Sequence, residues 1–151
     1  MFKDETKTTK KEFVVAEDVA IASVDDWLES VGFVRPEDDE LSEEEIKSFK
    51  INKNTLVRAV KEGRLTFNDD DTAEYTISQK SAEGYRGNKL NIALPTGRFW
   101  TATDGYKDNQ NMKKLQSCVS VLTGKDIGYF QNIFAGDWKV LQAVVIFFMN
   151  I

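Results

Sequence analysis

The sequence predicts an α+β fold, in which a small antiparallel β-meander of about three strands packs on a C-terminal group of about four helices. Between residues 65 and 94, apolar and polar residues alternate, and turn-forming residues separate the alternating segments. On both sides of that stretch, apolar residues recur at helical spacing. Hydrophobic residues make up 41% of the 151 residues, which is enough to build the core of one modest domain.

An acidic N-terminal extension, residues 1–40, is predicted to precede a single α+β domain, residues 41–151. Met1–Glu12 is mostly polar and charged, so it buries too little apolar area to offset the entropy of ordering and is expected to be a frayed tail. Residues 36–40 are a proline followed by four consecutive carboxylates, a composition typical of a linker. The extension is therefore predicted to be flexible and only partly helical.

Helices are predicted on both sides of this linker. Asp25–Val31 has acidic residues at its start and a glycine just after its end, which is typical of a short helix. Ser42 and Glu45 have the spacing of a capping box and predict the start of a helix. A second, stronger helix is expected from about Asn54, ending at Gly63.

Three strands are predicted next. Leu65–Phe67 and Ala73–Ile77 alternate apolar and polar residues, and Asn68–Asp71 between them has turn chemistry, so these segments predict a β-hairpin. Leu90–Leu94 keeps the period of two and precedes Pro95, which ends a strand. The three segments together predict an antiparallel meander.

The C-terminal third has helical periodicity, with breaks at glycines. Thr96, Asp126 and Asp137 are residue types that cap helices, and each is expected to begin one. The apolar stripe over Met112–Leu122 predicts a further helix, which Gly124 ends. About four helices are therefore expected after residue 96.

Charge and composition exclude several classes of function. The chain has 25 Asp and Glu against 20 Lys and Arg, a net charge of −5, and residues 1–62 hold all the excess acid. Binding by phosphate neutralisation needs a concentrated basic face, so nucleic acid is not an expected partner. The sequence lacks histidine, the commonest metal ligand and general base near neutral pH. We therefore expect a non-catalytic protein without metal or cofactor.

The sequence predicts neither export nor membrane insertion. Met1–Lys11 is polar and lysine-rich, unlike a signal peptide. The most apolar segment, Val140–Met149, is far shorter than the ~20 residues that span a bilayer. The polar face of its helix lacks the several lysines that hold an interfacial helix on lipid. Cys118 is the only cysteine, so the fold needs no oxidising compartment and a reducing cytoplasm fits best.

Three segments have partial likeness to chemical motifs. Gly84–Lys89 has too few residues between its glycines for a phosphate loop, and Asn68–Asp71 lacks the glycine and the distal glutamate of a calcium loop. Cys118 lies beside an apolar stripe, where a thiol is usually a small core residue. We interpret the first two as hairpin-loop and turn residues and the third as core.

The helix predicted over Asp137–Met149 is apolar around most of its circumference. Two interpretations remain open: it is the buried central helix of a small domain, or its surplus apolar surface meets a partner. The candidate partner-binding residues are Trp138, Leu141, Val145 and Phe148 on one helix face, with Phe99 and Trp100 as a second wall.

A series of short motifs follows in order along residues 54–149. After a helix come Gly63-Arg64-Leu65-Thr66-Phe67, a hairpin, Leu90-Asn91-Ile92-Ala93-Leu94-Pro95-Thr96-Gly97-Arg98, Val121-Leu122-Thr123-Gly124, and Ala135-Gly136-Asp137-Trp138-Lys139-Val140-Leu141-Gln142. This order and spacing resembles that of the tail assembly chaperones of long-tailed bacteriophages, most closely the family that includes the small tail protein of phage Mu. The chain departs from the pattern in its longer acidic region, residues 1–53, and in its more apolar ending.

The resemblance implies a protein that binds the tape measure protein of a phage or prophage and keeps it soluble until the tail tube polymerises. It implies action in the bacterial host cytoplasm and absence from the mature virion. In many such phages a programmed frameshift yields a longer form that recruits tail-tube protein. The family carries no catalytic residues. Whether the chain forms a homo-oligomer, and what residues 1–53 do, stays open.

Two other functions from different classes remain as alternatives. A structural tail or virion subunit assembles by strand pairing and usually needs larger sheets than the strand residues here provide. An acidic adaptor or inhibitor that mimics nucleic acid needs ordered carboxylates, whereas residues 37–45 look flexible. The presence or absence of the protein in purified virions separates the first of these from a chaperone.

Overall fold

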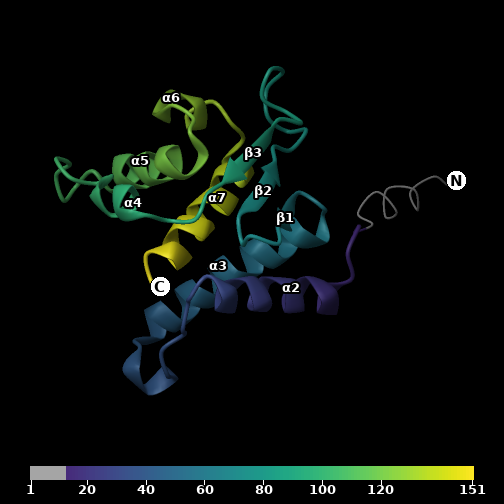
Figure 1. Cartoon of the computed structure of the whole chain (residues 1–151), viewed down its shortest axis with the longest axis vertical. Coiled ribbons are helices and arrows are strands. Elements are labelled where there is room, and N and C mark those ends of the chain that lie inside the picture. Colours follow the sequence, from purple (N-terminus) through teal and green to yellow (C-terminus); the bar gives the residue numbers. More distant parts are fainter. Residues whose placement is uncertain (1–12) are drawn as a thin grey trace, which may run out of the picture.

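A computed structural model describes residues 13–151, and the tail predicted at Met1–Glu12 lies outside them. The described chain forms six α-helices, one 3-10 helix and three strands (Figure 1). In order these are α2 (Glu17–Ser30), η1 (Asp38–Glu40), α3 (Glu43–Lys61), β1 (Leu65–Phe67), β2 (Ala73–Thr76), β3 (Lys89–Ile92), α4 (Gly97–Thr101), α5 (Asn111–Thr123), α6 (Ile127–Phe130) and α7 (Ala135–Phe148). The predicted α+β class, with its meander and four C-terminal helices, is confirmed.

The sheet has the order β1-β2-β3 with both pairs antiparallel, as the alternation predicted. Leu65 pairs with Tyr75, and Tyr75 pairs in turn with Leu90, so three buried side chains line one face of the sheet. The predicted turn closes the first hairpin, with Asn68 N–H donating to the Thr72 carbonyl at 2.8 Å. The third strand ends at Ile92, two residues earlier than expected.

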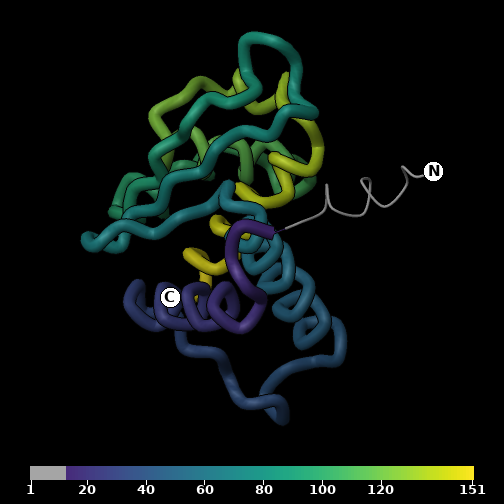
Figure 2. Tube along the Cα trace, turned by 90° about the vertical axis from the view of Figure 1, so that its right-hand side faces the viewer, coloured from purple at the N-terminus to yellow at the C-terminus, as the bar shows by residue number. Residues whose placement is uncertain are grey.

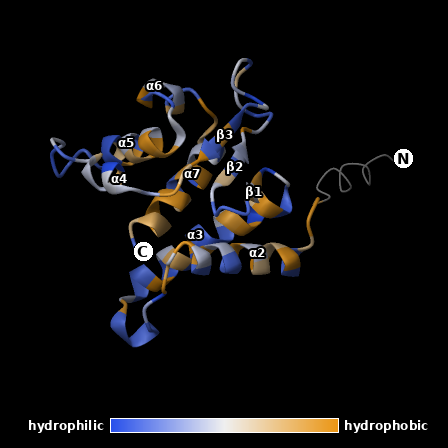
Figure 3. Ribbon diagram, viewed as in Figure 1, coloured by the Kyte–Doolittle hydropathy of each residue, from blue (hydrophilic) through white to orange (hydrophobic). Residues whose placement is uncertain are grey.

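Helix α7 is the centre of the core. Figure 1 shows it between the α4–α6 group and the α2–α3 pair, and it packs against both α3 and α5. Figure 2 shows α2 and α3 together at one end of the molecule, with the sheet and the α4–α6 group at the other. Figure 3 shows α7 as mostly hydrophobic, in contrast to the hydrophilic segment around η1. An all-round apolar helix is stable here because other elements cover it on several sides.

Helix α3 is one continuous helix of 19 residues, so the prediction of two helices in this region was wrong. Residues 50–53 contain no glycine or proline, and the backbone hydrogen-bond ladder therefore continues through them. The predicted capping box is confirmed: the Ser42 hydroxyl accepts from Glu45 N–H at 3.1 Å, and Glu45 accepts from Ser42 N–H at 2.9 Å.

Helix α2 begins at Glu17, eight residues before the predicted start. Its inward face buries Ala20, Val24, Trp27 and Leu28 in the same hydrophobic core as α3 and α7. The chain on either side of the boundary placed near residue 40 therefore shares one core. The predicted linker contains η1 and lies exposed between α2 and α3.

Two of the three residues that were expected to begin C-terminal helices do so. Thr96 and Asp126 occupy N-cap positions, but neither side chain makes a capping hydrogen bond. Asp137 was predicted as a cap, and this was wrong: α7 begins at Ala135 after the N-cap Phe134, and Asp137 lies within its first turn. Gly124 ends α5 in the left-handed conformation, with φ of 74°, as its position predicted.

Candidate functional site

The six candidate partner-binding residues lie in very different environments. Leu141, Val145, Phe148 and Phe99 are buried, none more than 2% exposed. These four side chains are core residues, and a partner has no access to them in this conformation. The central-helix interpretation of α7 therefore applies to most of its apolar circumference.

The two tryptophans retain some surface. Trp138 is partly buried beside Phe130, with ring centroids 6.1 Å apart, and its indole N–H is buried with no acceptor among the described residues. Trp100 is 52% exposed and stands edge-on to Phe99 at 5.3 Å. The structure does not bring the six residues together as one surface.

A groove that the sequence did not predict lies between α2 and α3. We call it the α2–α3 groove, and it has a volume of about 480 Å³. Its apolar lining comes from α2, the following loop, α3 and α7: Ile21, Leu28, Phe33, Ile46, Phe49, Val57 and Phe147. Three rings form its floor, since Phe33 lies 5.7 Å from Phe49 and 5.0 Å from Phe147 between centroids.

Charges of opposite sign border the two sides of the α2–α3 groove. Asp25 and Glu29 lie on the α2 side, and Lys50 and Lys53 lie on the α3 side. Arg35 of the loop after α2 also lines the groove and is paired with Asp38 at 2.6 Å. Lys53 Nζ and Asp25 Oδ1 form an ion pair at 2.7 Å that links the two helices. Both side chains are more than a third exposed, so water screens the pair and it adds little stability.

Sequence reasoning missed this groove because it depends on two helix boundaries. Ile21 joins the lining only because α2 extends back to Glu17, and Ile46 and Phe49 share it with Val57 only because α3 is continuous. One signal was present in the sequence. Ile46, Phe49, Lys53 and Val57 recur three or four positions apart, the spacing of one helix face across both predicted helices.

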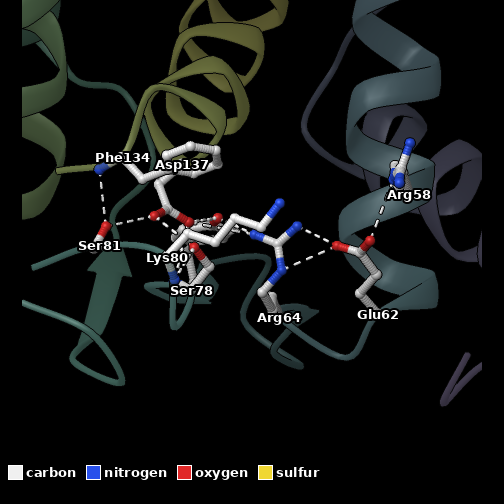
Figure 4. A network of polar contacts seen from close by, with 9 residues as sticks. Arg58, Glu62, Arg64, Ser78, Lys80, Ser81, Phe134 and Asp137 are labelled. Carbon is white, nitrogen blue, oxygen red and sulfur yellow. Dashed lines mark hydrogen bonds and ion pairs between the residues drawn. The ribbon is translucent and has the colours of Figure 1, made fainter. Parts of the chain in front are cut away.

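A second notable feature is a buried polar network around Asp137 (Figure 4). The Asp137 side chain is fully buried, and its carboxylate accepts from Ser78 N–H at 3.0 Å, Ser78 Oγ at 3.0 Å and Ser81 Oγ at 2.7 Å. Tyr75 also donates its hydroxyl to this carboxylate, and Arg64 Nη1 lies 3.4 Å from it. Both carboxylate oxygens are therefore in use, and the network joins the start of α7 to β2 and the loop that follows it.

Arg64 extends this network to α3. Figure 4 shows its guanidinium between Asp137 on one side and Glu62 on the other. Glu62 Oε2 accepts from Arg58 Nε at 3.2 Å. Burial raises the pKa of the Tyr75 hydroxyl, and its hydrogen bond to Asp137 raises it further, so Tyr75 remains a proton donor at neutral pH.

The pKa of Glu62 predicts part of the pH dependence of stability. Burial raises this pKa, but hydrogen bonds and charges of Arg64 and Arg58 outweigh burial and lower it below its ordinary 4.5. Because the folded-state pKa is the lower one, the stabilisation is present above pH 4.5 and is lost as pH falls through the folded value. We expect Glu62→Gln to flatten the pH dependence of the unfolding midpoint in urea below pH 4.5.

The control for that measurement is Glu83→Gln, in the exposed loop after β2, where the carboxylate has no ion pair within residues 13–151. The control should keep the wild-type pH profile. Equal profiles for the wild type and Glu62→Gln would contradict the assigned role of Glu62.

Within the described residues, metal-binding clusters and membrane-spanning helices are both absent. In residues 13–151, no group of three or more His, Cys, Asp or Glu is placed to hold a metal ion. Cys118 is buried in α5, as predicted for a core residue, and burial raises the pKa of its thiol. Within the same range, the helices are too short or too polar to cross a membrane.

The network and the α2–α3 groove thus differ in kind. The network is satisfied internally and holds elements together, whereas the groove presents apolar surface with a charged border. The chain matches no protein-family model, no curated protein and no solved structure.

Proposed function

We propose that the chain is a non-catalytic tail assembly chaperone of a phage or prophage, which binds the tape measure protein and keeps it soluble until the tail tube polymerises. The order of motifs over residues 54–149 supports this family assignment. The single structural observation that carries the proposal is the α2–α3 groove, an apolar channel open on the surface. It gives the part of the acidic region between residues 21 and 53 a role that the motifs left open.

The groove suits an amphipathic helix. Such helices bind by laying an apolar face into a hydrophobic groove, with anchoring side chains at positions i, i+3 or i+4 and i+7. Phe33, Phe49 and Phe147 supply an aromatic floor for these anchors. A tape measure protein is long and rich in amphipathic helices, so it carries many candidate segments of this kind.

The charges that border the α2–α3 groove indicate which kind of helical segment fits it. The α2 border carries Asp25 and Glu29 and the α3 border carries Lys50 and Lys53. A helix with basic residues along one side of its apolar face and acidic residues along the other pairs with both borders. Such pairs add specificity of orientation more than affinity.

Other parts of the proposal do not depend on the groove. We propose action in the bacterial host cytoplasm and no place in the finished virion. A frameshifted longer form that reaches tail-tube protein, and a homo-oligomeric state, stay predictions. A slippery heptanucleotide near the 3′ end of the coding DNA is the signature of such a longer form.

Co-expression with the tape measure protein tests the function, using a matched pair of variants. Ile46→Asp places a charge in the groove lining, whereas Ile51→Asp makes the same change on the same helix at an exposed position outside it. We expect the wild type and Ile51→Asp to raise the soluble yield of tape measure protein and to co-purify with it. Ile46→Asp should leave the yield near that without chaperone.

Circular dichroism and thermal unfolding of each purified variant show whether both remain folded. Unchanged tape measure yield with the wild type would contradict the chaperone function itself. Equal rescue by both variants would leave the function standing and reject the α2–α3 groove as its contact surface. High copy number in purified virions would favour a structural subunit instead.

A further inference from the structure

A cationic pocket borders the Asp137 network. We call it the α3–α7 pocket, and it has a volume of about 510 Å³. Four basic side chains from four parts of the chain line it: Arg58 of α3, Arg64 between α3 and β1, Lys80 of the loop after β2, and Lys139 of α7. Figure 4 shows Arg64 and Lys80 between the start of α7 and the end of α3. Segments far apart in the sequence thus gather positive charge at one place.

Both carboxylates of the α3–α7 pocket are paired, whereas its two lysines are not. Glu62 pairs with the two arginines, and the fully buried Asp137 accepts hydrogen bonds from two serines. Within residues 13–151, Lys80 and Lys139 take part in no ion pair. An anionic group that entered the pocket would therefore meet two ammonium groups without a carboxylate partner among the described residues.

Apolar surface adjoins these lysines. Phe134 lines the pocket and is 40% exposed, and Lys80 Nζ lies 5.4 Å from the centroid of its ring. A Cβ at position 136 would lie 2.6 Å from this ring, so Gly136 leaves the space that the ring occupies beside the start of α7. The α3–α7 pocket therefore suits a segment that carries carboxylates together with an apolar side chain.

The chain itself carries a segment of this chemistry. Residues 34–40, which we call the acidic tip, comprise η1 and the loop before it, and Figures 1 and 2 both show this part projecting from the body of the molecule. All four carboxylates of residues 37–40 are exposed, and Val34 beside them is 79% exposed. Among the described residues, Asp38 is the one member of these four with an ion pair, to Arg35 at 2.6 Å.

The acidic tip and the α3–α7 pocket lie at opposite ends of α3. The tip comes just before the first residue of α3, Glu43, whereas Arg58 lies in its last turn and Glu62 is its C-cap. At 1.5 Å per residue, this 19-residue helix is about 28 Å long. A contact between tip and pocket must therefore join two molecules. Because the two surfaces differ, such a contact is head-to-tail.

We propose that the acidic tip of one molecule binds in the α3–α7 pocket of a second copy of this chain. Carboxylates of the tip meet Lys80 and Lys139, and Val34 meets the ring of Phe134. Every joined molecule leaves one tip and one pocket unused, so repeated contacts produce a ring or an open row. Exposed charge pairs are individually weak and are screened by salt, so the assembly should be weak and salt-dependent. This inference does not rest on the proposed chaperone function.

Sedimentation of the full-length protein tests the proposal. At about 0.5 mM protein and about 20 mM NaCl, we expect a weight-average mass at least about 1.5 times that of the monomer, because salt screens little there. In about 0.5 M NaCl, where charges are screened over a few ångströms, the mass should return to that of the monomer.

Charge reversal on each side identifies the two surfaces. The tip variant carries Asp38→Lys and Asp39→Lys, and the pocket variant carries Lys80→Glu and Lys139→Glu; all four residues are exposed. Each variant alone should stay monomeric. An equimolar mixture should form a complex of one molecule of each, because the tip variant keeps its pocket and the pocket variant keeps its tip. This complex should not grow further.

Matched controls separate these contacts from effects of net charge. One control carries Asp104→Lys and Asp108→Lys, and the other carries Lys107→Glu and Lys113→Glu, all at exposed positions outside the tip and the pocket. Both controls should self-associate as the wild type does. Circular dichroism of every variant shows whether the fold is kept.

A wild type that stays monomeric at low salt would overturn the proposal. It would also be overturned if the tip or pocket variant alone still self-associated, or if their mixture stayed monomeric. Loss of self-association in the two controls would show an effect of net charge and no specific contact. If the wild type is monomeric and the pocket variant no longer rescues tape measure protein, the α3–α7 pocket takes an acidic segment of that partner and not a second copy.

Discussion

Replacement of Asp137 with alanine is expected to lower the free energy of unfolding by about 3–5 kcal/mol, the range for removing one member of a buried charged pair. The substitution leaves Ser78, Ser81 and Tyr75 without an acceptor inside the protein, and Arg64 keeps only Glu62 as a charged partner. Buried donors without partners each cost free energy. Urea unfolding at neutral pH, followed by fluorescence, measures the change.

Asp108→Ala is the matched control, because that carboxylate is fully exposed and lies 3.9 Å from Lys114 Nζ. We expect a change within about 0.5 kcal/mol there, as for most surface substitutions. Asp137→Asn should fall between the two, because an amide keeps one acceptor oxygen and loses the charge. A loss below about 1 kcal/mol for Asp137→Ala would refute the network as a stabilising element.

Phe148→Ala is expected to cost about 3–5 kcal/mol, the range for truncating a buried aromatic side chain. Phe148 has no exposed surface, and its ring lies 5.5 Å from that of Trp27 and 6.3 Å from that of Phe99. The cavity left behind would sit where α2, α4 and α7 meet. Thermal and urea unfolding of the purified variant measure the loss.

Trp100→Ala serves as the comparison, since Trp100 is 52% exposed and should cost less than about 1 kcal/mol. This pair of variants also decides between the two interpretations of α7. If Phe148→Ala kept wild-type stability and lost partner binding, Phe148 would be an interface residue and the central-helix interpretation would fail.

The meander was predictable because its signals are local. The alternation in Leu65–Phe67 and Ala73–Ile77, with a polar turn between them, specifies a hairpin without reference to any other part of the chain. The capping box at Ser42 is equally local, and it too was confirmed. Features that depend on a few adjacent residues could be derived from the sequence.

The position of α7 was only partly predictable. Its all-round apolarity indicated unusual burial, but the pattern of one helix does not say whether its own chain or a partner covers it. Helix α7 is covered by α3 and α5, and by Trp27 of α2. The full length of α2 was not predicted from the sequence. Four of the six proposed interface residues consequently belong to the core.

Asp137 shows a second limit of sequence reasoning. An aspartate near a helix start is most often a cap. Its position in the sequence is the same whether its side chain caps the helix or accepts hydrogen bonds from distant residues. Its donors Tyr75, Ser78 and Ser81 lie more than 50 positions away. Only the packing of β2 and its following loop against α7 brings them together.

Because α7 lies at the centre of the core, the core cannot form until α7 has been synthesised. Helix α3 ends at residue 61 and its packing partner α7 starts at residue 135, so a ribosome adds 73 residues between the two. During that interval the inward faces of α2, α3 and the sheet have no α7 to cover them, and such long-range contacts form slowly. The nascent chain must therefore remain unassembled, with apolar surface open to water and to other proteins, until residues up to 148 have left the ribosome. A protein proposed to cover the apolar helices of another protein therefore passes through a stage of synthesis in which its own apolar helix faces are uncovered.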